Sequence, residues 1–415
     1  MFFGVISIFG LLSVVNYRFG RSVFFPSFVF SAVWTVDLCL LASSGNMFYP
    51  VLMETLILLA LGCVAFSIGA FAGLVPPLSK PYLPEFSDTS NRIINWLLFF
   101  VIATIPFYYR WLAELTGNGD SPFLQMVRMA TQEMMGKSTA FTFFGTVSEL
   151  SRIIAMMCLW EREKFPKRAV LAIAVSFLLS ISTGQKFSPF LLACSLIAVD
   201  WFKTRRVRWK LLAIMASIML AAATAVEFYV HLGGGSFTEN IGSVFDIFVL
   251  YGSGGIVGFD QTVRHPHIIP DISSIGTVFL RVTRKLGADV DVPEVPDFVN
   301  IGPNSLRDNA FTMFWTYLDL GYVGMLAIVV VIGFFTTIAY RLALQGRKRW
   351  IFLYATLLYS IIFSFFTDYF VPMSYYLFKI ALVSWCVYAL PVRLRQFRDF
   401  ISESVRNDLG RSRVV

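Results

Sequence analysis

The chain has 415 residues, of which 57% are hydrophobic and 14% are charged, and its mean hydropathy is +0.69. This composition leaves too little polar surface to cover a soluble globule, so it excludes an ordinary soluble enzyme and predicts a polytopic membrane protein. The formal net charge is +8, but the basic residues stand in short clusters at the ends of apolar runs. Such clusters are typical of orientation signals, so no nucleic-acid partner is expected.

Apolar runs near the roughly 20 residues that cross a bilayer occur about eleven times. If the basic tail PVRLRQFRDF is cytoplasmic, alternation also places the clusters NYRFGR, EREKFPKR, KTRRVRWK and RLALQGRKRW inside, as the positive-inside rule requires. The sequence thus predicts an all-α integral membrane protein, with one membrane domain over 1–415 and a cytoplasmic tail over about 392–415. The expected spans are 2–16, 23–43, 48–74, 94–109, 139–160, 168–183, 187–202, 210–230, 313–340, 351–367 and 372–391.

This topology leaves two substantial external segments, about 110–138 and 231–311, and the second contains all three histidines. Charges in 231–311 are interleaved with apolar stretches such as SVFDIFVLYG. The segment is therefore expected to fold against the membrane as short helices and loops, and not as a separate domain. No internal repeat is evident along the chain.

Lys186 lies at the tip of a hydrophobic hairpin, between the expected spans 168–183 and 187–202. Both flanks of the hairpin are basic and cytoplasmic, which places the tip on the outer side. About 15 residues precede the tip and reach roughly 22 Å, short of a bilayer core of roughly 30 Å. An ammonium group below the surface costs about 2–3 kcal/mol and indicates a functional site. The alternative is a lysine that extends its stem to the interface.

The stretch YGSGGIVGFDQTVRHPHIIPD, 251–271, combines glycines with Asp260, Arg264, His265 and His267. The glycines do not have the GxGxxG spacing, so no dinucleotide site is predicted. The two histidines lack a third ligand at metal-binding spacing, and no metal site is predicted. One histidine is a candidate general base, because imidazole titrates near neutral pH; residues of a solvated loop are the alternative.

Further cations and carboxylates interrupt the apolar sequence. Arg281 and Arg284, in GTVFLRVTRKLG, share a face if the stretch is helical, and paired guanidinium groups match phosphate oxygens. The alternative is a cluster that meets anionic lipid headgroups. Arg152 follows Glu149 by three residues, which favours a local ion pair. Lys379, in the last span, is expected to pair with Asp319 or Asp368.

The run NAFTMFWTYLDLGYVGML, 309–326, resembles the polar and aromatic start of a late helix in the Wzy-type O-antigen polymerases, which join bacterial oligosaccharide repeat units. Three other stretches agree in order: TGQKF, YGSGGIVGFD and RVTRKLG. The resemblance covers about the last two thirds of the chain. One departure is Lys186, because the hairpin tip often carries arginine in this family.

The resemblance implies an inverting, all-helical integral glycosyltransferase of GT-C-like architecture in the bacterial inner membrane, with a periplasmic insert. Its substrates would be undecaprenyl-diphosphate-linked oligosaccharides, reached from the membrane lipid, and a chain-length regulator is a further expected partner. No metal or other cofactor is expected. A leaving diphosphate needs fixed cations, and an acceptor hydroxyl needs a base. The candidate cations are Lys186, Arg264, Arg281 and Arg284, and the candidate bases are His265, His267, Asp260 and Asp308.

Two other functions fit the same features. An O-antigen ligase uses the same donor and differs in its acceptor. A lipid-linked oligosaccharide flippase or other transporter would also place cations inside the membrane, although internal repeats are more typical of that class. The large one-sided external segment favours an enzyme at the outer face.

Overall fold

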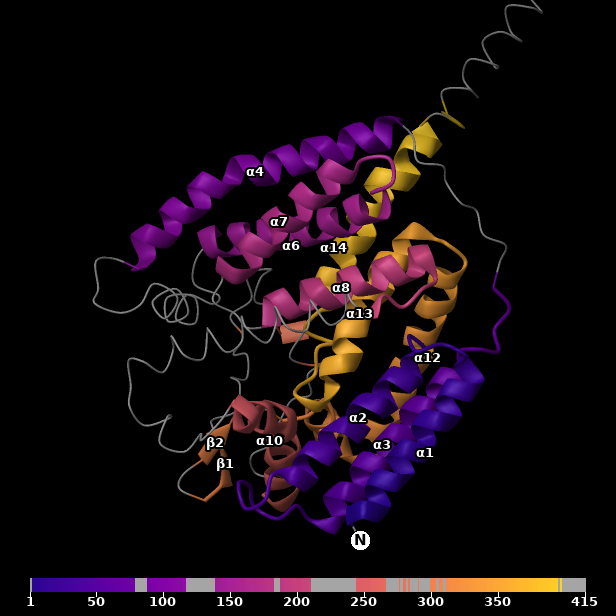
Figure 1. Ribbon diagram of the computed structural model, residues 1–415, viewed down its shortest axis with the longest axis vertical. Helices are drawn as coiled ribbons and strands as arrows, with labels where there is room; N and C mark the ends of the chain where they lie inside the picture. Colours follow the sequence, from indigo (N-terminus) through magenta and orange to yellow (C-terminus); the bar gives the residue numbers. More distant parts are fainter. Residues whose placement is uncertain are drawn as a thin grey trace, which may run out of the picture. The chain divides into compact units, whose positions relative to one another are not determined.

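Most residues that the computed structural model describes lie in helices (Figure 1). Among the described residues, seven helical stretches are long and apolar enough to cross a membrane: Phe3–Gly20, Pro26–Ser43, Met53–Ala72, Asp88–Glu114, Phe143–Trp160, Trp315–Leu344 and Ser374–Leu394. The chain is therefore a helical multi-pass membrane protein, and this part of the prediction is confirmed. The structure describes residues 2–78, 88–116, 139–182, 187–209, 244–265, 276, 279–280, 283, 290, 299–303, 306–308, 311–394 and 396–397.

Three more of the expected spans form shorter or less apolar helices. They are α7 (Pro166–Ser182), α8 (Phe187–Thr204) and α13 (Lys348–Ile362), with 17, 18 and 15 residues. The expected span 210–230 lies outside the described residues. The number of eleven spans therefore stays a prediction.

The chain divides into two compact units. Unit 1 comprises Met1–Ser79, Leu220–Leu344 and Tyr354–Tyr375. Unit 2 comprises Lys80–Met219, Gln345–Leu353 and Tyr376–Val415. The expectation of one membrane domain over 1–415 stays a prediction.

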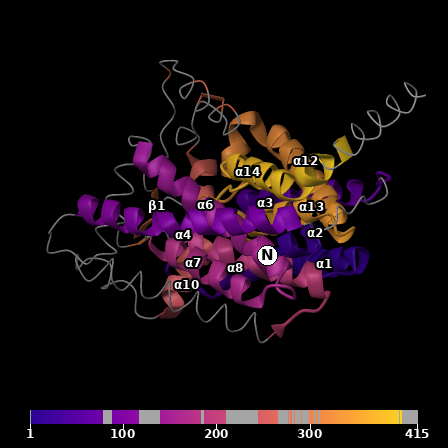
Figure 2. The ribbon, with the colours of Figure 1, turned by 90° about the horizontal axis from the view of Figure 1, so that it is seen from above.

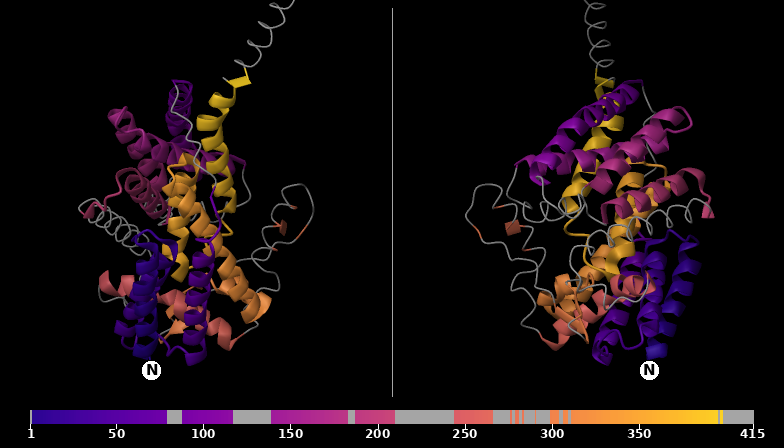
Figure 3. Two further views of the ribbon diagram at one scale, coloured as in Figure 1. Left: turned by 90° about the vertical axis from the view of Figure 1, so that its right-hand side faces the viewer. Right: turned by 60° about the vertical axis from the view of Figure 1, so that its left-hand side comes forward.

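Four helices lie side by side in unit 1 (Figures 1 and 3): α1 (Phe2–Gly20), α2 (Pro26–Ser43), α3 (Met53–Ala72) and α12 (Gly321–Leu344). The buried side-chain amide of Asn16, on α1, donates to the Ser27 carbonyl at 3.1 Å and to the hydroxyl groups of Ser31 and Ser67 at 3.2 and 3.1 Å. One polar side chain thus joins α1, α2 and α3. Such hydrogen bonds stabilise helix pairs where lipid offers no partner.

Helices α3 and α12 pack in parallel through glycines. A Cβ atom on Gly69 would collide with the backbone carbonyl of Val330, and one on Gly73 would lie 2.8 Å from the carbonyl oxygen of Phe334. From the α12 side, a Cβ atom on Gly333 would collide with the Phe66 carbonyl. Gly69 and Gly73 have the small-xxx-small spacing that lets membrane helices approach closely. This contact is the most extensive between two helices of unit 1.

Helix α10 (Val244–Arg264) corrects the expectation for the segment 231–311. It is one helix of 21 residues, where short helices and loops are expected. Its glycines lie inside the helix, and a Cβ atom on Gly255 would collide with the Phe365 carbonyl. Glycine weakens isolated helices, so a glycine-rich sequence favours the prediction of a loop. Here glycine instead lets α10 approach its neighbours.

A two-stranded antiparallel hairpin, β1 (Val299–Gly302) and β2 (Leu306–Asp308), corrects the same expectation. Val299 pairs with Asp308, and Asn300 pairs with Arg307. The N–H of Tyr49 donates to the Ile301 carbonyl at 2.9 Å, so the hairpin is attached to the loop between α2 and α3.

Unit 2 contains α4 (Asp88–Thr116), α6 (Thr139–Trp160), α7 and α8, which adjoin one another in Figure 2. The π-helical turn Trp385–Ala389 follows α14 (Ser374–Ser384) and contacts α4. Arg168, near the start of α7, donates to the side-chain oxygens of Asn91 and, at 2.9 Å, Asn95 on α4. These contacts join the cytoplasmic ends that the topology predicts for both helices.

Candidate functional site

Two predicted site residues, Asp260 and Arg264, meet at the end of α10 in unit 1. The Arg264 Nε donates to Asp260 Oδ2 at 2.6 Å, and its Nη2 donates to the Pro50 carbonyl. The other carboxylate oxygen, Oδ1, accepts the Leu52 N–H at 2.9 Å and the Thr55 hydroxyl at 2.6 Å. Asp260 is fully buried, while the Arg264 side chain is 32% exposed.

This bonding makes Asp260 a cap for another helix. Leu52 is the N-cap residue of α3 and has no side-chain cap of its own, and Asp260 supplies the missing acceptor. The negative charge also suits the positive end of the α3 dipole. With both oxygens occupied by donors, Asp260 has little capacity to accept a proton from a substrate hydroxyl. Its geometry favours a structural role over that of a general base.

The other predicted site residues are only partly described. His265 follows the last residue of α10, and its N–H donates to the Gln261 carbonyl at 2.9 Å. Asp308 is the last residue of β2. Neighbouring Arg307 donates from Nε to the Asn300 side chain at 3.0 Å. His267, Lys186, Arg281 and Arg284 lie outside the described residues.

Unit 2 contains an arginine inside a membrane-spanning helix. Arg152 lies in α6 and donates from Nη1 to the Ser188 hydroxyl at 2.5 Å. Its guanidinium carbon lies 5.3 Å from the centre of the Tyr376 ring. The Nε of Arg152 is buried and has no hydrogen-bond partner among the described residues. The group is thus only partly compensated within the part of unit 2 that the structure describes.

The position of Ser188 connects Arg152 with the predicted hairpin. Ser188 is the second residue of α8, so it lies in the first turn of that helix, where the backbone N–H groups point toward the helix end. On the other side of the tip, the hydroxyl of Ser182, the last residue of α7, lies 2.5 Å from the Tyr109 hydroxyl. A helix N-terminus beside a guanidinium group is a favourable place for an anion.

Lys379 has a different partner from those expected. Its ammonium forms an ion pair with the Glu149 carboxylate and lies 3.1 Å from the Thr146 hydroxyl. The expectation of a pair with Asp319 or Asp368 is wrong. The helical spacing of Glu149 and Arg152 favours a local pair, but the glutamate pairs instead with α14, and the arginine bonds to α8. Spacing along one helix cannot reveal a partner on another helix.

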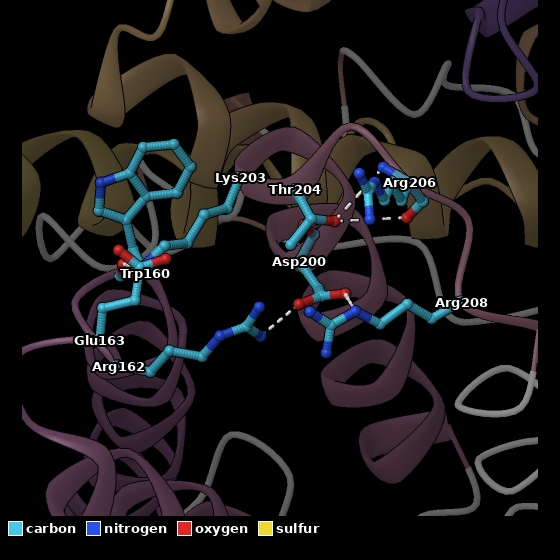
Figure 4. Close-up of polar contacts among 8 residues, drawn as sticks. All are labelled: Trp160, Arg162, Glu163, Asp200, Lys203, Thr204, Arg206 and Arg208. Atoms are coloured by element: carbon cyan, nitrogen blue, oxygen red, sulfur yellow. Dashed lines mark hydrogen bonds and ion pairs between the residues drawn. The ribbon is translucent and has the colours of Figure 1, made fainter.

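Asp200 in unit 2 lies between two guanidinium groups at the end that the topology predicts to be cytoplasmic (Figure 4). Arg162 donates to its Oδ1, and the Nε of Arg208 lies 3.4 Å from its Oδ2. Nearby, the Lys203 ammonium donates to the Trp160 carbonyl. These bonds join the end of α6 to the end of α8. These contacts give the basic residues of the two loops a structural role beside their role in membrane orientation. We assign no catalytic role to the cluster.

Arg152 is the functional candidate that sequence reasoning undervalued. The position of an ionisable residue within an apolar run is enough to select Arg152 as a candidate site residue, because such residues in spans commonly mark functional sites. Among the described residues, no three His, Cys, Asp or Glu side chains gather as a metal site would require. No protein-family model, curated protein or solved structure matches the chain.

Proposed function

We propose that the chain is an inverting glycosyltransferase that polymerises undecaprenyl-diphosphate-linked oligosaccharide repeat units into O-antigen or a related surface polysaccharide. One observation carries the proposal: the intramembrane guanidinium of Arg152 donates to Ser188, two residues after Lys186. A partly compensated cation in a span costs about 2.5–3.5 kcal/mol, which an anionic ligand would offset. The resemblance to O-antigen polymerases supports a lipid-linked diphosphate as that anion.

The proposed reaction uses the cation on the leaving group. The acceptor hydroxyl attacks the anomeric carbon of the donor glycan from the side opposite the diphosphate, and the bond from that carbon to the diphosphate oxygen breaks. Negative charge then grows on the leaving oxygens, where Arg152 and the N-terminus of α8 would stabilise it. A guanidinium group is suited to this task because its N–H groups form two parallel bonds to phosphate oxygens.

The hydroxyl proton must pass to a base. His265, His267 and Asp308 remain the candidates from sequence, whereas the occupied oxygens of Asp260 make it the weakest of the four. Lys186, Arg281 and Arg284 remain proposed diphosphate ligands. Arg264 already bonds to Asp260 and Pro50, and so offers fewer free N–H groups.

The finer features of the sequence prediction belong to the same proposal. We place the protein in the bacterial inner membrane, with about eleven spans, a GT-C-like architecture, external segments over about 110–138 and 231–311, and a cytoplasmic C-terminus. Its partners would be the lipid-linked oligosaccharide, the surrounding lipid and a chain-length regulator.

Substitution of Arg152 tests the proposal. Arg152→Gln, expressed in a host that lacks the chromosomal copy, should leave single repeat units on lipid A. Arg152→Lys should recover part of the polymer, because the charge persists but the two-pronged bond is lost. We expect a loss of about 10- to 150-fold in rate for Arg152→Gln, corresponding to about 1.5–3 kcal/mol.

Arg110→Gln is the matched control in the same unit. The Arg110 side chain is 81% exposed and pairs with Glu114 one turn along α4, so its loss should leave long polymer. Membrane abundance of each variant is measured by immunoblot. Long polymer from Arg152→Gln at normal abundance would remove this residue from the site. A deletion strain with no glycan on lipid A would indicate a ligase, and one with repeat units trapped inside would indicate a flippase.

A further inference from the structure

Asp37 is a buried carboxyl group inside a membrane-spanning helix of unit 1. It lies in α2, six residues before the end of the helix at Ser43, which corresponds to a depth of about 9 Å along the helix. The residue is 2% exposed, and its neighbours Trp34 and Leu38 are fully buried. Neither water nor lipid headgroups therefore reach the carboxyl group in this conformation.

Neither carboxyl oxygen has a hydrogen-bond partner among the described residues. Across from Asp37, helix α10 presents Gly252 and Ser253. The Ser253 hydroxyl donates to the backbone carbonyl of Asp37 at 3.3 Å. A Cβ atom on Gly252 would lie 3.2 Å from Asp37 Oδ1 and 2.9 Å from the side chain of Leu40. Because Gly252 has no side chain, α10 leaves room for the Asp37 carboxyl group.

The described cations of unit 1 near these helices are engaged elsewhere. Arg264 is bonded to Asp260, and Arg341, on α12, donates to the carbonyls of Gly73 and Pro76 at 2.9 and 2.8 Å. Among the described side chains, the titratable or charged groups on the elements that pack on α2, and near their ends, include Tyr17 and Arg18 (α1), Glu54 and Cys63 (α3), Tyr251, Asp260 and Arg264 (α10), Tyr317, Asp319, Tyr322, Tyr340 and Arg341 (η2 and α12), and Asp368 and Tyr369 after η3.

An ionised carboxylate here would be a buried charge with no cation bonded to it among the described residues, and the Ser253 hydroxyl would be its nearby neutral donor. Such a state is far more costly than a neutral acid, which gains a donor group and loses the charge. The Ser253 hydroxyl is close enough to become its acceptor after rotation. A carboxyl that is buried alone in this way differs from Asp260, which is buried with an arginine and two neutral donors.

We propose that Asp37 is a proton-binding site within the membrane, where the carboxyl group carries an exchangeable proton at neutral pH. The inference does not depend on the proposed glycosyl transfer, which uses no residue of α2. Because ionisation requires a cation or a further donor to approach, movement of α10 away from α2 would be linked to release of the proton. Helix packing in the outer half of unit 1 would thereby respond to proton concentration.

Infrared difference spectroscopy on the purified full chain in lipid vesicles tests the proposal. Subtracting the spectrum of Asp37→Asn from that of the unsubstituted protein at pH 7 should reveal a carboxylic-acid carbonyl band that shifts in deuterium oxide. Asp260→Asn is the matched control, because that carboxyl is equally buried but paired with Arg264; its difference spectrum should contain carboxylate bands instead. Carboxylate bands from Asp37→Asn would overturn the proposal.

A second arm distinguishes the proton from sodium. The acid band should be the same in sodium and in choline buffers, and a band that appears only when sodium is removed would mean that a metal cation occupies the carboxylate, against the proposal. If Asp37→Asn does not fold, Asp37→Glu serves in its place. The acid band should then move in frequency, and an unmoved band would assign it to another carboxyl and overturn the proposal.

Discussion

The Asp260–Arg264 pair predicts an effect on stability that is separable from catalysis. In Arg264→Gln, Asp260 would remain buried with its charge no longer matched by an arginine, and we expect the protein to lose about 1.5–3 kcal/mol. The double variant Asp260→Asn/Arg264→Gln should lose less than the sum of the single variants, because it leaves no unpaired charge. Thermal unfolding in detergent measures all three. Strict additivity would show that the two side chains do not act as a pair.

Asp368 predicts a dependence of stability on pH. Burial raises its pKa to about 6, although the Tyr317 hydroxyl and the Phe370 N–H donate to the carboxylate at 3.0 and 2.8 Å and oppose this shift. An unfolded aspartate has a pKa of about 3.9, so the folded state binds the proton more tightly. The resulting stabilisation is complete below about pH 4 and is lost as the pH rises through about 6.

The expected size of this effect is on the order of 3 kcal/mol, since one pKa unit corresponds to about 1.4 kcal/mol. Asp368→Asn should flatten the stability profile between about pH 4 and 6 relative to the unsubstituted protein. Thermal unfolding midpoints across this range measure the difference. Parallel profiles for the two proteins would contradict the assignment to Asp368.

At the level of residues, the sequence identifies chemistry better than partnership. Asp260 and Arg264 are four residues apart on one helix, so their pairing was within reach of helical spacing. Helical spacing could not predict the capping of α3 by Asp260, because Leu52 and Thr55 lie some 200 positions earlier in the chain. Lys379 failed for the same reason. The expected partners, Asp319 and Asp368, precede Lys379 by 60 and 11 positions, whereas the actual partner, Glu149, precedes it by 230 positions.

At the level of elements, the α3–α12 contact predicts that the effect of replacing a glycine by alanine on stability depends on where the glycine lies. Gly69→Ala should destabilise the protein by about 1–3 kcal/mol, because the added carbon would collide with the Val330 carbonyl and push α12 away. Gly10→Ala, in α1 of the same unit, is the control, since nothing lies within 4 Å of its Cβ position. Unfolding in detergent compares them. Equal stability of the two variants would mean that the close helix contact does not form.

The glycine-rich stretch of α10 forms a helix that local helix propensities do not predict. A run such as YGSGG favours a loop in an aqueous protein, where glycine in a helix costs about 1 kcal/mol. In unit 1 these positions face neighbouring backbone and the Asp37 carboxyl, and small size matters more than propensity. The hairpin 299–308 was missed because its strands have three or four residues and lack a clear alternation of apolar side chains.

At the level of the whole molecule, the topology predicts opposite sides for the two ends of α3. Asn46→Cys, in the exposed loop before α3, should react with an impermeant maleimide from the outside. Val75→Cys, which is 82% exposed just after α3, should react only when the membrane is opened. The label is read by mass spectrometry in a background without the five native cysteines. The reverse pattern would invert the predicted orientation.

Hydropathy sufficed for the class of protein and for the approximate position of most helices, because the bilayer imposes one length on every span. It could not define the division into two units, which depends on which helices pack together. It also placed the span 351–367 several residues too late in the chain, since α13 covers Lys348–Ile362, whereas the expected span 168–183 agrees closely with α7.

The parallel packing of α3 on α12 has a consequence for biogenesis. Parallel neighbours cannot be the two arms of one hairpin, and here about 250 residues of synthesis separate them. When α3 leaves the insertion machinery, its Gly69–Gly73 face has no helix to cover it, and lipid or a chaperone must occupy it until α12 is made. Assembly of unit 1 is therefore a late, post-insertion event. Nascent chains that stop before residue 344 should be preferred substrates of membrane quality-control proteases.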